Sequence, residues 1–317
     1  MQKKTLSRSS QQGMTLIELL VAMACLVLVL AGVYHVFFTQ SLSSTAEINI
    51  LEAQINARAG MDRIAHVLRH AGFGCRESFV AGETMSGSDP NGTAVSVDSI
   101  LWNFQDNNAT GQPANADAVD VVHGFREAGE VTTAITANST KQDRVKVYFN
   151  PTAADPIVID DTKNFHDYIC FFPHMEGDIF YGVSGSTSPL TVDKDIQLLQ
   201  ENASIFMVTP TRITLNADGD LIFQIFADGF DEEIASGFED LQFEYTEDGT
   251  TWSGVPANPN KVIAIRAWLL ARSERGDPGY TDTRTYTYAG QTVGPFNDNI
   301  HRWLIEETVW IRNKVAD

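Results

Sequence analysis

The chain has 317 residues and a hydrophobic content of 43%, which is enough for one large folded domain and excludes general disorder. Its formal net charge of −19 argues against nucleic acid as a partner, since binding phosphate groups requires clustered Lys and Arg side chains.

The charge is distributed unevenly along the chain. Residues 1–13 contain Lys3, Lys4 and Arg8 and no acidic residue, which leaves 19 basic and 41 acidic residues, a formal charge of −22, on the remainder. A short basic segment before an apolar run is expected to stay in the cytoplasm and to direct the following chain across the membrane.

An apolar run of 25 residues, Met14–Phe38, follows this basic segment and contains one charged residue, Glu18. As a helix it would be about 37 Å long, enough to cross a hydrocarbon layer of about 30 Å. A cleaved secretory signal has a shorter apolar region, although 44–46 (Ser-Thr-Ala) is a weak cleavage sequence downstream. A plain single-pass anchor leaves unexplained why a carboxylate lies inside the span.

The sequence Gly-Met-Thr-Leu-Ile-Glu at 13–18, together with the long apolar run, resembles the type IV prepilin signature. That resemblance implies cleavage between Gly13 and Met14 by a prepilin peptidase, which also N-methylates Met14, with the apolar helix retained in the mature protein. Family members usually have Phe where this chain has Met14. The resemblance also implies a bacterial inner-membrane protein with one span that later enters a pilus or pseudopilus.

Glu18 has two interpretations. Cleavage would create a charged amine at Met14, and two opposite charges about 4 Å apart attract by roughly 4 kcal/mol at an effective dielectric constant near 20. Glu18 of one subunit would then pair with the amine of its neighbour and fix the axial register of assembly. Alternatively, Glu18 only stabilises the N-terminus of its own helix. Both interpretations stay open.

The helical pattern continues beyond the membrane segment. Apolar residues recur at near-helical spacing after Phe38, and the glycines Gly72 and Gly74 are natural stop signals. We therefore expect four segments: a leader at 1–13, a membrane or filament-core helix at 14–38, an amphipathic continuation at 39–74 and a β-rich periplasmic head at 75–317.

Short alternating runs separated by Gly, Asn, Asp and Pro fill the head. The predicted strands are Ala94–Leu101, Ala118–His123, Arg144–Phe149, Tyr168–Phe172, Ser204–Thr209, Arg212–Leu215, Leu221–Phe226, Leu241–Tyr245, Val262–Leu270 and Trp303–Arg312. Asn216–Asp220 predicts a hairpin turn, and Ser86–Thr93, Gln105–Asn115 and Ala128–Thr140 predict loops. The expected fold class is α+β, a long N-terminal helix packed on a β-rich head, as in pilins.

Gly237, Leu241 and Tyr245 lie in a strand pattern that resembles PilW-type minor pilins and the J-type minor pseudopilin. The stretches Val262–Ser273 and Glu307–Asn313, and Arg69–Cys75 at the helix end, are more similar to PilW. The resemblance implies a minor pilin that helps initiate or cap a pilus, with other minor pilins, the major pilin and the inner-membrane assembly platform as partners. A J-type pseudopilin of a type II secretion system and a pilin-anchored surface adhesin are the alternatives.

Three cysteines are present. Cys25 lies in the apolar run, whereas Cys75 and Cys170 lie in the head and would be able to pair outside the cytoplasm. The other interpretation is two separate buried thiols.

The sequence contains no motif of an enzyme, so we expect no catalytic residue, no cofactor and no metal site. His66 and His70 have the spacing of a metal-binding pair, but position 67 is Val, which excludes the metalloprotease pattern. His166 and His174 flank Cys170 without a recognised zinc spacing. The acidic stretches 218–220 and 228–233 do not fit the helix-loop-helix calcium loop, and solvated turns explain them better than calcium.

Overall fold

The structure is a computed structural model. It describes residues 15–89, 92–106, 116–135, 145–147, 149–151, 168–173, 179–184, 190–194, 196, 198–226 and 230–312. The leader at 1–13 lies outside these residues, as do Gly13 and Met14. The chain divides into two compact units, 1–49 and 50–317.

The helices are α1 (Leu16–Arg69), α2 (Arg76–Val80) and the 3-10 turn η1 (Pro259–Lys261). The strands of the first half are β1 (Met85–Ser88), β2 (Ala94–Val97), β3 (Leu101–Gln105), β4 (Ala118–Val131), β5 (Val145–Val147), β6 (Phe149–Pro151), β7 (Tyr168–Phe172), β8 (Tyr181–Ser184) and β9 (Leu190–Val192). Those of the second half are β10 (Ser204–Leu215), β11 (Leu221–Ile225), β12 (Phe230–Ala235), β13 (Phe238–Thr246), β14 (Ala264–Arg272), β15 (Tyr286–Tyr288), β16 (Gln291–Val293) and β17 (Arg302–Trp310).

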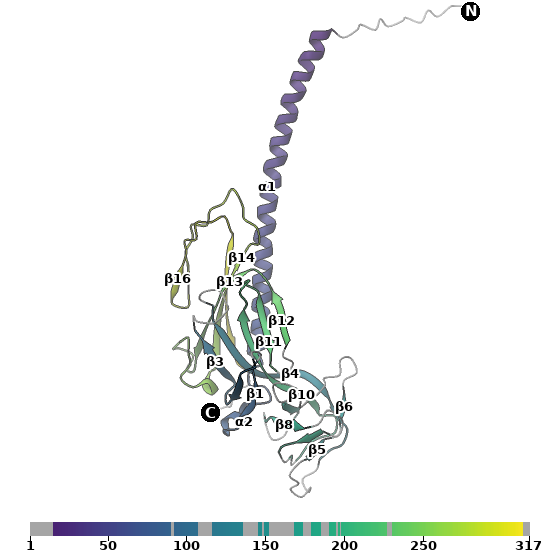
Figure 1. The fold of residues 1–317 in the computed structure, drawn as a ribbon, viewed down its shortest axis with the longest axis vertical. Helices are drawn as coiled ribbons and strands as arrows, with labels where there is room; N and C mark the ends of the chain where they lie inside the picture. The colour runs from purple at the N-terminus through teal and green to yellow at the C-terminus, as the bar shows by residue number, and fades with distance from the viewer. Residues whose placement is uncertain are drawn as a thin grey trace, which may run out of the picture. The chain divides into compact units, whose positions relative to one another are not determined.

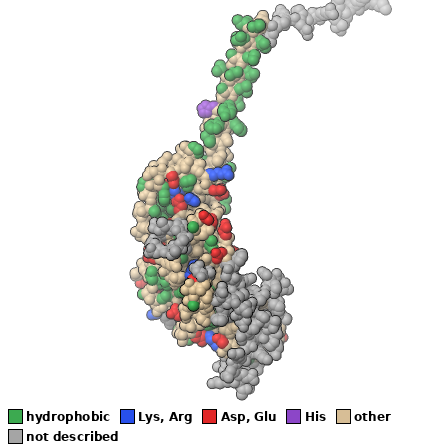
Figure 2. Space-filling view, viewed as in Figure 1, with side chains coloured by type: hydrophobic (Ala, Val, Ile, Leu, Met, Phe, Trp, Pro, Cys, Tyr) green, Lys and Arg blue, Asp and Glu red, His purple; other side chains and the backbone are tan. Residues whose placement is uncertain are grey.

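The first unit contains the apolar part of α1. Every side chain from Leu16 to Thr45 is exposed, and hydrophobic side chains predominate along this part of the helix on the face that Figure 2 shows. The helix is long and apolar enough to cross a membrane. A helix that is apolar on every side is unstable in water, so this segment is suited to lipid or to a bundle of similar helices.

Within the second unit, α1 is amphipathic and packs against the strands. Its buried face carries Ala53, Ala57, Met61, Ile64 and Leu68, with the spacing of one helix face. At Gly60 an added Cβ would lie 3.1 Å from side-chain atoms of β13 and β14 and 3.3 Å from one of β11. Glycine therefore lets the helix approach both sheets closely (Figure 1).

The helix ends where the glycine signals predict. Arg69 is its last residue, and Gly72 has a φ of +78°, a left-handed conformation that glycine adopts without strain. The expected helix over 39–74 is thus observed up to residue 69, and a short turn and α2 follow.

A smaller sheet has the strand order β13–β14–β17 and is antiparallel throughout. One face carries Leu241, Phe243, Ile265 and Leu269 toward the main core. The opposite face carries Trp268 and Leu270, which the β15–β16 hairpin covers with Tyr286 and Tyr288.

The larger sheet runs β12–β11–β10–β7–β8–β9–β5, and β4 pairs with the other edge of β10 and with β3 and β6. Its central strand β10 contains Pro210, which lacks an N–H donor. On one edge β10 pairs with β7 over 204–208 and with β11 over 211–215. The Pro210 carbonyl accepts from Phe226 on that same edge. The missing donor therefore falls in the gap between two partner strands, which is why proline is tolerated there.

The observed strands refine the prediction in several places. Ser204–Thr209 and Arg212–Leu215 are one continuous strand, whereas Ala94–Leu101 and Arg144–Phe149 are each split between two strands. Part of the predicted loop Ser86–Thr93 belongs to β1, and Ala128–Val131 belongs to β4. The hairpin turn at Asn216–Asp220 is confirmed, with the Asn216 side chain accepting from the N–H groups of Asp218 and Asp220. Residues 107–115 and 136–140 of the other predicted loops lie outside the described residues.

Candidate functional site

The N-terminus of α1 is closed by a reciprocal pair of side chains. The Thr15 N–H and hydroxyl each donate to Glu18 Oε2 at 2.9 Å, and the Glu18 N–H donates to Thr15 Oγ1 at 3.4 Å. This arrangement is a capping box, which satisfies backbone donors that a helix start leaves without partners. Within one subunit Glu18 therefore stabilises its own helix, the second of the two interpretations of this residue.

Of the predicted histidine pair, His66 is exposed on α1, and His70 is half-buried in the turn directly after the helix. The rings of His66 and His70 are 4.7 Å apart, and His70 Nδ1 lies 2.8 Å from the His66 carbonyl oxygen. His123 lies on β4. Burial, and to a smaller extent the charges of His70 and His66, lower its pKa to about 3, so His123 is neutral at physiological pH.

Among the residues that the structure describes, no three or more His, Cys, Asp or Glu side chains are grouped to hold a metal ion. The stretch 218–220 forms the β10–β11 turn, whereas His166, His174 and residues 228–229 lie outside the described part of the chain.

Cys75 and Cys170 are buried in the same hydrophobic cluster, and Cys25 is exposed on α1. Cys170 Sγ lies only 2.2 Å from where a Cβ on Gly74 would be. The strand β7 therefore places one sulfur beside the residue that directly precedes Cys75.

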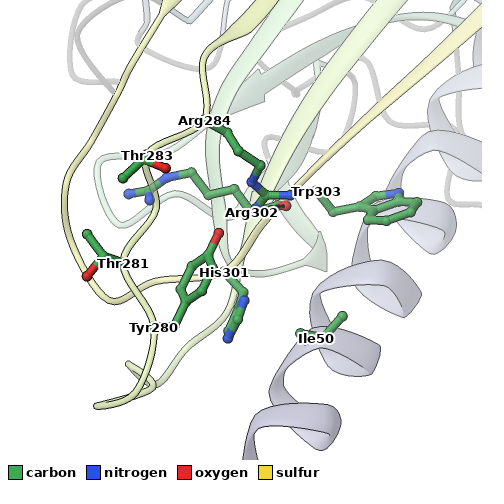
Figure 3. A pocket seen from close by; sticks show the side chains of 8 residues that line it. All are labelled: Ile50, Tyr280, Thr281, Thr283, Arg284, His301, Arg302 and Trp303. Carbon is green, nitrogen blue, oxygen red and sulfur yellow. Dashed lines mark hydrogen bonds between the residues drawn. The ribbon is translucent and has the colours of Figure 1, made fainter.

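A cavity of about 270 Å³ opens beside α1 in the second unit (Figure 3). One wall is formed by Ile50 of α1 and Trp303 of β17, and the other side by the segment between β14 and β17. That segment contributes Tyr280, Thr281, Thr283, Arg284 and His301 to the lining, and β17 contributes Arg302.

Arg302 is the centre of an ionic network behind the cavity. Its side chain is only 2% exposed. The guanidinium donates to both oxygens of Glu239 on β13, to both oxygens of Asp298, and at 3.2 Å to Asp282. It also stacks over the Phe296 ring at 3.7 Å. A buried cation with three carboxylates ties the 273–301 segment to the smaller sheet.

Asp282 is the second centre of the network. Its buried carboxylate accepts from the hydroxyls of Tyr280 and Tyr286 at 3.0 and 2.9 Å and from Arg284 Nε at 3.0 Å. Although burial alone would raise it, hydrogen bonds from Arg284, Tyr286 and Arg302 lower the pKa of Asp282 to about 2. The carboxylate is therefore ionised at neutral pH and holds Tyr280 and Arg284 in place.

The two ends of the chain match different family models. Residues 8–34 match the prokaryotic N-terminal methylation motif, and residues 224–313 match the type IV pilus-assembly protein W family, PilW. A type IV pilin-like N-terminus thus precedes a PilW-type region. The two matches support a type IV pilin-like role in pilus assembly. A comparison with curated proteins and solved structures finds no match.

The PilW-type region of this pilin-like protein contains β12, the whole smaller sheet, and the segment that lines the cavity. The stretch with Leu241 and Tyr245 and the stretch Val262–Ser273, on which the resemblance was based, contain the adjacent strands β13 and β14 of that sheet. Both of the families found are structural, so the comparisons offer no enzyme activity.

The cavity was not predicted from the sequence. Its lining residues are adjacent only after β17 returns beside β14, and their partner Glu239 comes from β13. The one local signal was the density of Tyr, Thr and Arg between residues 280 and 288.

Proposed function

We propose that this pilin-like protein is a minor type IV pilin that helps initiate or cap pilus assembly. The observation that carries the proposal is the order of its parts, a methylation motif and exposed apolar helix followed by a PilW-type region. The peptidase would cut between Gly13 and Met14 and methylate Met14. The inner-membrane platform would then add the subunit, head in the periplasm, to a filament with other minor pilins and the major pilin.

The first test determines the N-terminal residue of the native protein after its extraction from the membrane. Intact mass and N-terminal sequencing are expected to show a start at N-methylated Met14. A start at Met1 would reduce the protein to a simple anchored domain, and a start beyond Phe38 would make it a secreted protein. Either result would contradict the proposal.

The second test separates a pilus from a secretion pseudopilus. Deleting the gene from its native host is expected to reduce or abolish surface pili, counted by electron microscopy, and complementation should restore them. Normal pili together with loss of an exported protein would favour the J-type pseudopilin instead.

We also propose that Cys75 and Cys170 form a disulfide once the head is in the periplasm. Closing so long a loop would stabilise the head by up to about 4–5 kcal/mol in the chain-entropy model. Alkylation of the denatured, non-reduced native protein is then expected to label Cys25 alone. Cys75→Ser should lower the thermal midpoint, whereas Cys25→Ser, the matched control, should not. Labelling of all three cysteines would show that the core thiols stay reduced.

A further inference from the structure

We propose that the cavity beside α1 binds the ring of a neutral sugar. The cavity is lined by aromatic rings, two threonine hydroxyls and two guanidinium groups, and no carboxylate is among its lining residues (Figure 3). This binding activity goes beyond a role in pilus assembly and would give the head a ligand of its own.

The walls offer flat aromatic surfaces. Tyr280 and His301 stack with ring centroids 3.9 Å apart and an angle of 21° between their planes. Trp303, which is 39% exposed, lies on the other side of the cavity in Figure 3. Sugar rings present a face of C–H groups, which carry slight positive charge and pack favourably on the negative face of an aromatic ring.

The remaining lining groups exchange hydrogen bonds with hydroxyls. Thr281 and Thr283 are exposed at the cavity, and each hydroxyl both donates and accepts. Arg284 uses Nε for Asp282 and Nη2 for the Arg302 carbonyl, and its side chain is still 52% exposed. Its guanidinium therefore presents further N–H donors to a ligand oxygen.

The charges around the cavity select against ions of either sign. A cationic ligand would meet Arg284 and Arg302 in the lining. An anionic ligand would meet the field of the carboxylates that pair with Arg284, Arg302 and His301, and these carboxylates outnumber the two arginines. Those carboxylates are Asp277, Asp282, Asp298 and Glu239. A neutral, hydroxyl-rich ligand avoids both penalties while using the same donors.

The site is formed before any ligand arrives. Arg302 holds the segment between β14 and β17 through three carboxylates, and Asp282 fixes the Tyr280 hydroxyl. A preorganised site loses little free energy to ordering on binding. At about 270 Å³ the cavity lies just below the roughly 300–1,000 Å³ typical of drug-sized ligands, so it suits one ring rather than a chain.

The test is ligand-observed NMR with the full-length protein in phospholipid nanodiscs, because sugar-headed detergents would compete. The probes are the methyl glycosides of glucose, galactose, mannose and N-acetylglucosamine, with glucuronate as the charged probe. We expect at least one neutral glycoside to bind with a dissociation constant on the order of 1 mM, and glucuronate to bind more weakly.

Trp303→Ala is expected to weaken that binding about tenfold, because it removes a stacking wall. Trp310→Ala is the matched control, since Trp310 is exposed on the same strand and is not a lining residue, and it should bind as the wild type does. Thr283→Val removes one hydroxyl at nearly constant volume and should also weaken binding, which keeps the test valid if Trp303→Ala folds poorly.

Three results would overturn the proposal: no neutral glycoside binds, glucuronate binds best, or Trp303→Ala and Trp310→Ala behave alike. Loss of pili in the Trp303→Ala strain without any sugar binding would instead make the cavity a contact between subunits. Because processing at Met14 and pilus counts are measured separately, failure of sugar binding leaves the proposed assembly function untouched.

Discussion

Glu18→Ala is expected to leave membrane insertion intact and to abolish incorporation into filaments. Insertion depends on the basic leader, which the substitution leaves unchanged, and on the apolar helix, which Glu18→Ala makes no less apolar. Assembly would lose an attraction of roughly 4 kcal/mol between Glu18 and the methylated amine of a neighbouring subunit. The measurements are membrane fractionation of the variant and its amount in sheared pili.

Two further variants separate this pairing from capping. Thr15→Ala removes the hydroxyl that bonds to Glu18 but keeps the carboxylate charge, so near-normal assembly is expected. Glu18→Gln keeps a hydrogen-bonding side chain without the charge and should fail as Glu18→Ala does. If Glu18→Gln assembles normally while Thr15→Ala fails, the capping box, rather than pairing between subunits, is what assembly requires.

The helix could be predicted because its signals are local. One uninterrupted apolar run, helical spacing beyond it and glycine at its end all act within a few residues, and α1 was observed from Leu16 to Arg69. Tyr168–Phe172 was predicted with its observed bounds, because alternation over a few residues is a local signal too.

The rest of the fold depends on partners far away in the sequence. Two strands were predicted at Ser204–Thr209 and Arg212–Leu215, but Pro210 does not interrupt β10, because the partner strand changes from β7 to β11 at that residue. The short strands β15 and β16 have little alternation of their own and are held by packing on Trp268 and Leu270. No local sequence pattern predicts which of these distant strands pair or pack together.

The candidate sites divide in the same way. Glu18 was predicted because a carboxylate inside an apolar run is conspicuous in a sequence. The cavity was not predicted, since Arg302 is separated from Glu239 by 63 positions in the chain and from Asp282 by 20. Only the pairing of β13, β14 and β17 brings these residues together.

Arg302→Ala is expected to destabilise the head by about 3–5 kcal/mol. The substitution removes a cation that is 2% exposed and leaves the buried carboxylate of Asp282 and the partly buried carboxylate of Glu239 without it. Urea unfolding of the full-length protein, followed by tryptophan fluorescence, measures the change. Arg284→Ala is the control. Its side chain is 52% exposed and Asp282 keeps its other donors, so a loss of about 1 kcal/mol is expected.

The pH dependence of this loss distinguishes charge from packing. The pKa of Asp282 is lowered in the folded protein from 3.8 to about 2, so its stabilising effect is present above about pH 4 and is lost as the pH falls toward 2. In Arg302→Ala the same carboxylate lacks one cation, its folded pKa rises, and protonation relieves the buried negative charge. The difference in free energy of unfolding between wild type and variant should therefore become smaller as the pH falls from about 7 to about 3. If the difference in free energy of unfolding stays constant over this range, Arg302 acts through its packing on Phe296. The ionic network would then be a consequence of the fold and not the interaction that keeps the cavity open.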